Sequence, residues 1–282
     1  MYSNLQQVFQ NLIKSYLQLM LSKTAASSAF PAGLYTPYSM PHKGKDDRIM
    51  NLSAASSRQP NPLRRHTLYL KDPASAISHF IGAIGFAGAG IPLLIKAGQS
   101  GQPLALVSMI VYAVSLVALY AASAAYHTIS PRSPRETLLK KIDHMMIFVL
   151  IAGSYTPVCL LALPRFSGLV LLGVIWGCTL LGACSMFFFV FCPKWVSSVL
   201  YIAMGWACVF ALPQLLGCLS GACFGWLLAG GLIYTAGGVI YALKRPEFER
   251  RHPNFGMHEI FHLFVMAGSL CHYIVMYVYL LG

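Results

Sequence analysis

Residues 103–127 read PLALVSMIVYAVSLVALYAASAAYH, and this stretch decides the fold class. It contains no Asp, Glu, Lys or Arg, and as a helix rising about 1.5 Å per residue it is long enough to cross ~30 Å of hydrocarbon. A backbone in contact with lipid must satisfy its own polar groups, so the stretch has to be helical. It therefore predicts a transmembrane helix that ends in a histidine.

Apolar runs of similar length recur on both sides of this stretch. The predicted spans are Ala74–Ala97, Pro103–His127, Ile142–Leu163, Gly168–Phe191, Trp195–Gly217, Cys223–Leu243 and Met257–Leu281. The composition agrees, since 57% of the residues are hydrophobic, only 10% are charged and the mean hydropathy is +0.63. The expected fold is all-α, a bundle of seven transmembrane helices that comprises residues 73–282.

The third span has the clearest start signal. Ser133-Pro134-Arg135-Glu136 offers an N-cap serine, a proline at the first helical position and a glutamate that could complete a capping box. We therefore expect this helix to begin outside the membrane.

The basic residues are distributed very unevenly between the two ends of the predicted bundle. Eighteen Lys and Arg fall on the side that holds the N-terminus, and two, Lys96 and Arg165, fall on the other side. Cytoplasmic loops carry such an excess, so we expect a cytoplasmic N-terminus and an external C-terminus. The net charge of +12 thus reflects topology rather than nucleic-acid binding. The expected location is a multi-pass position in the plasma (inner) membrane.

Residues 1–72 differ in composition from the rest and are expected to form a cytoplasmic extension. Apolar residues recur at helical spacing over Leu5–Met20, which favours an amphipathic helix on the inner leaflet. Ser, Ala, Pro and basic residues dominate from Thr24 to Arg65, which is typical of a disordered linker. The alternative is that translation starts at Met50.

Ionisable residues inside a span are costly, so they are the first candidates for function. Ser123 and His127 lie four residues apart at the end of the second span, and His258 and His262 have the same spacing at the start of the seventh. Residues four apart share a helix face. Asp143 lies where the third span begins. The predicted topology brings all of these residues to one membrane depth, near the cytoplasmic leaflet.

Three neutral imidazoles that leave one coordination position open form a recurring catalytic zinc site, in which the metal lowers the pKa of water toward ~7. We expect His127, His258 and His262 to be the ligands of a Zn²⁺ ion. Asp143 is a candidate catalytic residue that takes a proton from the metal's water or orients an imidazole, and Ser123 is a candidate donor to the water or to a substrate carbonyl.

The other polar residues near the predicted site have simpler explanations. Residues 258–262 read HEIFH and match the H-E-x-x-H metalloprotease pattern by letter, but we expect Glu259 to face lipid headgroups or the basic loop. His144 is expected at the interface, and His79 is expected to pack against a neighbouring helix. His272 lies ten residues beyond His262, roughly 15 Å along the axis, so it is expected to line a cavity or pack rather than bind the same ion.

Four motifs together resemble the hemolysin III family, which is related to the progestin and adipoQ receptors and more distantly to alkaline ceramidases. The similar segments are Ala76–Gly82, Ser123–His127, Asp143 with Ile151–Pro157, and His258–His262 through His272. The resemblance covers residues 73–282 and implies zinc bound by His127, His258 and His262, with Ser123 and Asp143 beside it. The sequence departs from the family at Pro73, where an acidic residue often leads into the first helix.

Three functions follow from these expectations. The first is a zinc-dependent hydrolase of a lipid amide or ester, with membrane lipids as its partners. The second is a receptor or regulator of membrane-lipid state in which zinc only holds helices together. The third is the pore-forming cytolysin of the family name, although the spans are too apolar for an evident ion pathway. Three measurements distinguish these functions: the zinc content of the purified protein, its turnover of lipids, and leakage of dye from vesicles.

Overall fold

The computed structural model describes residues 71–131, 133–188, 194–243, 246–252 and 255–281, and all regular structure in these ranges is helical. The amphipathic helix expected at Leu5–Met20, the linker at Thr24–Arg65 and the alternative start at Met50 lie outside them. These features of the extension stay predictions.

Within these described ranges, seven helices are long and apolar enough to cross a membrane, as the sequence predicted. They are α2 (Pro73–Gln99); α3 (Pro103–Thr128); α4 (Glu136–Pro157) with the π-helical η1 (Val158–Ala162); α5 (Arg165–Phe188); α6 (Lys194–Gly205) with η2 (Trp206–Ala211) and α7 (Leu212–Cys218); α8 (Gly221–Ala242); and α10 (Met257–Ile274) with the π-helical η3 (Val275–Leu280). A short helix, α9 (Pro246–Arg251), precedes α10.

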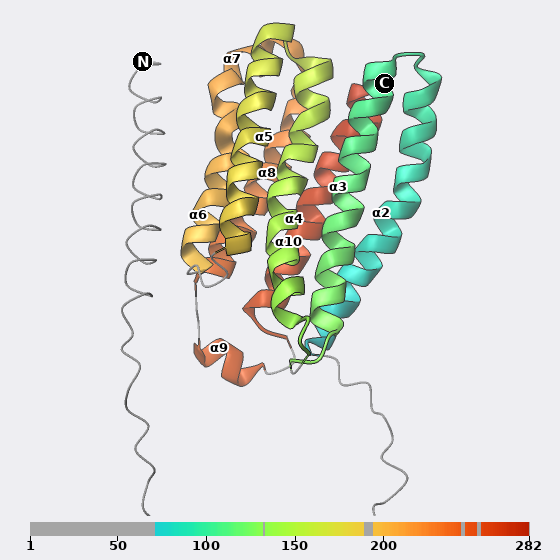
Figure 1. Cartoon of the computed structure of the whole chain (residues 1–282). Helices are drawn as coiled ribbons and strands as arrows, with labels where there is room; N and C mark the ends of the chain where they lie inside the picture. The colour runs from blue at the N-terminus through green and yellow to red at the C-terminus, as the bar shows by residue number, and fades with distance from the viewer. Residues whose placement is uncertain (1–70, 132, 189–193, 244–245, 253–254, 282) are drawn as a thin grey trace, which may run out of the picture. The chain divides into compact units, whose positions relative to one another are not determined.

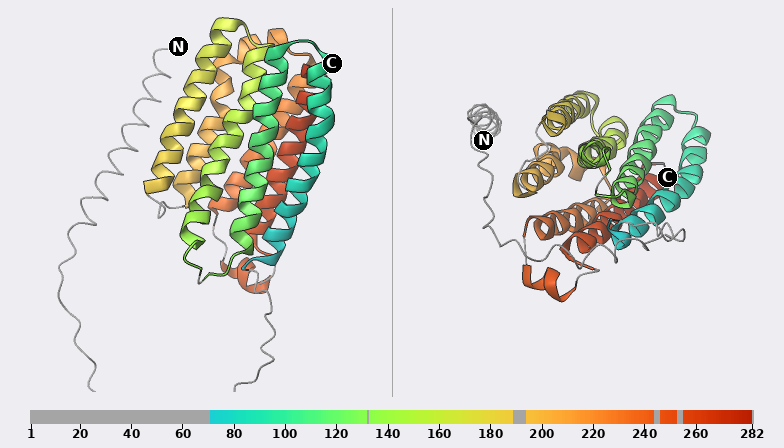
Figure 2. Two further views of the ribbon diagram at one scale, coloured as in Figure 1. Left: turned by 45° about the vertical axis from the view of Figure 1, so that its right-hand side comes forward. Right: turned by 60° about the horizontal axis from the view of Figure 1, so that its bottom comes forward.

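Figures 1 and 2 show these helices side by side in one bundle, with α3 packed against α2 and α4, and α10 packed against α8 and α2. Small residues allow the closest approaches, as expected where lipid supplies no hydrophobic drive between helices. A Cβ atom on Gly153 of α4 would overlap the Ser115 hydroxyl of α3. A Cβ atom on Gly230 of α8 would likewise overlap the His272 ring of α10.

The fifth span is broken, although the sequence predicted one continuous helix. Its middle, η2, is a 3₁₀ helix, and Pro213 follows at the start of α7, where it cannot donate a backbone hydrogen bond. The Tyr155 hydroxyl donates to the Gly205 carbonyl at 2.6 Å and accepts from the Cys208 N–H at 2.9 Å. A side chain from α4 thus satisfies backbone groups beside the break, which lipid could not do.

The start of α4 also differs from the prediction. Its N-cap is Arg135, with no side-chain capping bond, so the predicted capping box is wrong. Ser133 instead accepts a hydrogen bond from the Arg135 N–H within the preceding turn. Glu136 pairs with Lys71 at 2.6 Å, and Lys71 also donates to the Tyr126 hydroxyl at 2.8 Å. Burial lowers the pKa of Lys71, but these hydrogen bonds and the charge interactions with the same two side chains together outweigh burial and leave its pKa above the ordinary value.

The helix ends that carry the polar motifs meet at one end of the bundle. The N-terminal ends of α2, α4 and α10 and the C-terminal end of α3 all lie at the lower end in Figure 1. This arrangement confirms that sequence-distant motifs converge at one depth. The orientation of that end relative to the cytoplasm stays a prediction from the charge asymmetry.

Candidate metal centre

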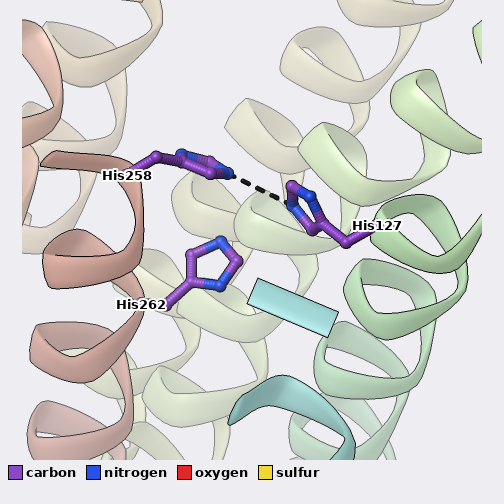
Figure 3. A group of neighbouring side chains, drawn as sticks. All are labelled: His127, His258 and His262. Atoms are coloured by element: carbon purple, nitrogen blue, oxygen red, sulfur yellow. Dashed lines mark hydrogen bonds between the residues drawn. The ribbon is translucent and has the colours of Figure 1, made fainter. Parts of the chain in front are cut away.

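Three histidines face one another at this end of the bundle (Figure 3). His127 belongs to the last turn of α3, and His258 and His262 belong to the first turns of α10. One ring nitrogen from each lies within 4.8 Å of the others, which makes them a group that could hold a metal ion. The Nε2 atoms of His127 and His258 are 3.2 Å apart. The structure therefore brings together the three residues that the sequence predicted as ligands.

The His127 ring is oriented by Asp72, which sequence reasoning missed. The Asp72 carboxylate lies 2.9 Å from His127 Nδ1, and the Asp72 N–H donates to the His127 carbonyl at 3.2 Å. An ionised carboxylate can only accept, so Nδ1 carries the proton and the Nε2 lone pair faces His258. Such a carboxylate partner is the usual way in which a metal-binding histidine is held in one tautomer and orientation.

A sequence signal for Asp72 was present. It is one of only eight acidic residues, and it lies directly before the proline that begins α2, at the predicted depth of the site. The acidic residue expected at the entrance to the first helix thus exists one position before Pro73.

Glu259 does not face headgroups or the basic loop, so that expectation is wrong. One carboxylate oxygen accepts from the Gly256 N–H at 2.7 Å, and the other accepts from the Ser75 hydroxyl at 2.8 Å. The first bond caps α10, where an acidic side chain also complements the helix dipole. The second ties α10 to α2. The glutamate of the H-E-x-x-H match is therefore a capping residue of α10, and each of its two carboxylate oxygens already accepts a hydrogen bond.

His79 lies inside the site as well as against a neighbouring helix. Its ring stacks on His262, with centroids 3.6 Å apart and planes 16° apart, and it meets the edge of Tyr120 at 5.0 Å. Only 3% of His79 is exposed, and neither ring nitrogen has a hydrogen-bond partner among the described residues. The expected packing role is confirmed, and it places His79 directly behind one predicted ligand.

An apolar cavity of about 430 Å³ opens beside the histidines. The residues of α4 and η1 in its wall run from Asp143 in α4 to Val158 at the start of η1, fifteen positions, or roughly 22 Å. Ser123, which is buried, and Asp143 both line the cavity together with His258 and His262. The two predicted catalytic residues and two predicted ligands thus border one space.

His144 also lines the cavity, and its expected position at the membrane interface stays a prediction. The Nδ1 atom of His144 lies 2.9 Å from the Lys140 carbonyl and 3.7 Å from Asp143, and His144 is not part of the three-histidine group. His272 lines the cavity further along α10, as expected.

The chemistry of the three-histidine group fits a zinc ion. All three donors are imidazole nitrogens, which zinc accepts readily. The His262 Nδ1 atom is buried and has no hydrogen-bond partner among the described residues, so the protein leaves a polar atom here unsatisfied. His127, with its proton fixed on Nδ1, presents Nε2 to the group.

The fold and the site together define a class: a seven-span membrane protein with a buried three-histidine group at one end of an apolar cavity. The chain belongs to the haemolysin-III related family, whose model matches residues 68–273. It is therefore a multi-pass integral membrane protein, and the predicted plasma-membrane location agrees with this family.

Individual relatives agree with this assignment. Hemolysin-3 of Bacillus cereus is 38% identical over 209 residues, which cover 73% of this chain and 91% of that protein. The Hemolysin-3 homolog of Bacillus subtilis (strain 168) is 36% identical over 196 residues, or 70% of this chain and 88% of that protein. The Adiponectin receptor protein of Drosophila melanogaster is 25% identical over 217 residues, which cover 70% of this chain and 48% of that protein. The resemblance predicted from the motifs is confirmed.

Proposed function

We propose that this chain is a zinc-dependent hydrolase that cleaves an amide or ester bond of a membrane lipid. The observation that carries the proposal is a three-histidine group beside Ser123 and Asp143 at one end of a long apolar cavity. A hydrolase of this kind needs a polar reacting end and an apolar space for the tail, and the cavity wall offers both.

The residues of the site divide the chemistry between them. His127, His258 and His262 would hold the zinc ion, which when bound supplies Lewis-acid polarisation of a carbonyl and a lowered pKa for water. The Asp143 carboxylate accepts a proton from the attacking water and returns it to the leaving nitrogen or oxygen as the scissile bond breaks. The Ser123 hydroxyl donates to the carbonyl oxygen, where negative charge develops.

Substrate binding has to be driven by polar contacts rather than by burial of the tail. A lipid tail already lies in hydrocarbon, which is as apolar as a leucine side chain, so moving it into the cavity gains little. Each methylene would gain about 0.8 kcal/mol only if it came from water. The groups that select the lipid are therefore the polar ones in the cavity wall.

The test combines metal analysis with turnover on a panel of lipid amides and esters. Purified protein should contain about one zinc per chain, and His258→Ala and His262→Ala should lose it. Asp143→Asn should keep its zinc and its melting temperature but release no fatty acid.

The matched control is Glu259→Gln, which is also an acid-to-amide change at this end of the bundle. It should retain turnover, because Glu259 caps α10 rather than moving a proton. Loss of turnover in Glu259→Gln with full activity in Asp143→Asn would assign the base to Glu259 and contradict the proposed mechanism. A metal-free wild type would contradict the zinc site itself.

A receptor or regulator of membrane-lipid state is the second candidate, and the similarity to a protein named Adiponectin receptor favours it. Zinc would then hold α3 and α10 together without chemistry. Zinc that raises the melting temperature, combined with no turnover on any lipid of the panel, would support this function over the hydrolase.

The name Hemolysin-3 of the Bacillus relatives leaves a cytolysin as the third candidate. Dye release from vesicles that rises with protein dose would support it. The spans make it the weakest of the three, because they are too apolar for an evident ion pathway.

A further inference from the structure

His272 lies in the part of the cavity wall that is distant from the three-histidine group. It lies on α10 ten residues beyond His262, roughly 15 Å along the helix axis. Gly230 of α8 makes room for it, since a Cβ atom there would overlap the imidazole ring. An ionisable side chain at this depth in a membrane protein is costly unless it has a partner or a function.

The ring has one weak partner and one vacant acceptor. Nε2 lies 3.4 Å from the Leu227 carbonyl. A carbonyl only accepts, so Nε2 carries the proton and Nδ1 is left with a lone pair. Nδ1 is buried and has no hydrogen-bond partner among the described residues. Leaving such a group unsatisfied costs about 1–3 kcal/mol, so a hydrogen-bond donor from elsewhere would be favoured.

Neighbouring polar groups in the same part of the wall already have partners within the protein. The Ser154 hydroxyl donates to the Leu150 carbonyl at 2.9 Å. The Thr235 hydroxyl donates to the Gly231 carbonyl at 2.7 Å and accepts from the Trp206 indole N–H at 2.8 Å. The Tyr234 hydroxyl is 2.8 Å from the Ser269 hydroxyl. In this described part of the wall, His272 Nδ1 therefore stands out as an acceptor that a ligand could use.

We propose that His272 selects a lipid whose acyl chain carries a hydroxyl group in its middle, by accepting a hydrogen bond from that hydroxyl at Nδ1. The inference rests on the proposed function, which places the carbonyl end of the chain at the histidine group. An extended chain with C–C bonds of ~1.5 Å and near-tetrahedral angles advances ~1.25 Å per carbon, so ~15 Å corresponds to roughly twelve carbons. Because Nδ1 accepts, a hydroxyl at this position fits and a ketone does not.

The test is competition for the cavity of the purified, zinc-loaded full-length protein, with the fluorescent polyene cis-parinaric acid as the displaced probe. The competitors are stearic acid, 12-hydroxystearic acid and 12-oxostearic acid, which have the same chain length. Wild type should bind the 12-hydroxy acid roughly three- to tenfold more tightly than the other two, the value of one neutral hydrogen bond. His272→Phe, which keeps a ring of similar shape, should bind all three equally.

A second variant keeps the test decisive if His272→Phe does not fold. Gly230→Ala keeps His272 but displaces its ring, and it should also reduce the preference for the 12-hydroxy acid. Equal affinities in wild type would overturn the inference while leaving acyl binding in place. A preference that persists in both variants would place the hydroxyl elsewhere and also overturn it. Failure of every acid to displace the probe from wild type would contradict the proposed lipid function and the inference together.

Discussion

At the scale of single residues, the Asp72–His127 pair determines which nitrogen His127 can offer to a metal. The carboxylate holds the proton on Nδ1, and 2% of the His127 side chain is exposed, so little else competes for the ring. Without this partner the ring could rotate or adopt the other tautomer. The position of His127 in the last turn of α3 is thus not enough, and its orientation depends on a residue from the start of α2.

We therefore predict that Asp72→Ala lowers zinc affinity by roughly 10- to 100-fold, the usual effect of removing the partner of a metal-binding histidine. Affinity is measured by competition with a zinc-chelating dye in detergent. The control is Glu247→Ala, which removes an exposed carboxylate from α9 and should leave zinc affinity unchanged. An Asp72→Ala protein that binds zinc as tightly as wild type would show that Asp72 does not position His127.

The sequence predicted which three histidines come together but not the residues that support them, and the reason is physical. His258 and His262 share a helix face by their spacing, and His127 shares their depth by topology, so all three follow from local rules. The contacts Asp72–His127 and Ser75–Glu259 join residues 55 and 184 positions apart. Such pairs depend on which helices are neighbours, which hydropathy does not reveal. Asp143 and Ser123 line the cavity, and their catalytic roles stay predictions.

At the scale of elements, the fifth span shows that hydropathy is sufficient to predict a membrane span but not a break within it. The run Trp195–Gly217 correctly predicted a span, because length and apolarity decide that outcome. It did not predict the 3₁₀ segment η2, although a proline inside the run, Pro213, indicates a possible break in the helix. The break persists because Tyr155 on α4 satisfies the Gly205 carbonyl and the Cys208 N–H, a contact between two spans.

Tyr155→Phe should accordingly destabilise the bundle by about 1–3 kcal/mol, the cost of leaving backbone polar groups within a membrane span without partners. The measurement is the free energy of unfolding from an SDS titration in mixed micelles. Tyr279→Phe, in η3 at the end of the last span, removes the same atom from a different span and serves as the control. If both variants unfold alike, the Tyr155 hydroxyl does not support the broken span.

At the scale of the whole molecule, the excess of Lys and Arg predicts that the end with the histidine group faces the cytoplasm. A fluorescent protein fused to the N-terminus should therefore fluoresce, and alkaline phosphatase fused to the C-terminus should be active, because that enzyme needs an external, oxidising compartment. The exchanged fusions should give the opposite results. Phosphatase activity at the N-terminus would reverse the predicted orientation and move the site to the outer face.

The distance in sequence between the two parts of the three-histidine group has a consequence for biosynthesis. His127 and His258 are 131 residues apart, so at about 5–20 residues per second His258 is made roughly 7–26 s after His127. Asp72, in contrast, precedes His127 by 55 residues and is already present when α3 inserts. The nascent chain can therefore fix the His127 ring early, and the three-histidine group is complete only when the last span has entered the membrane.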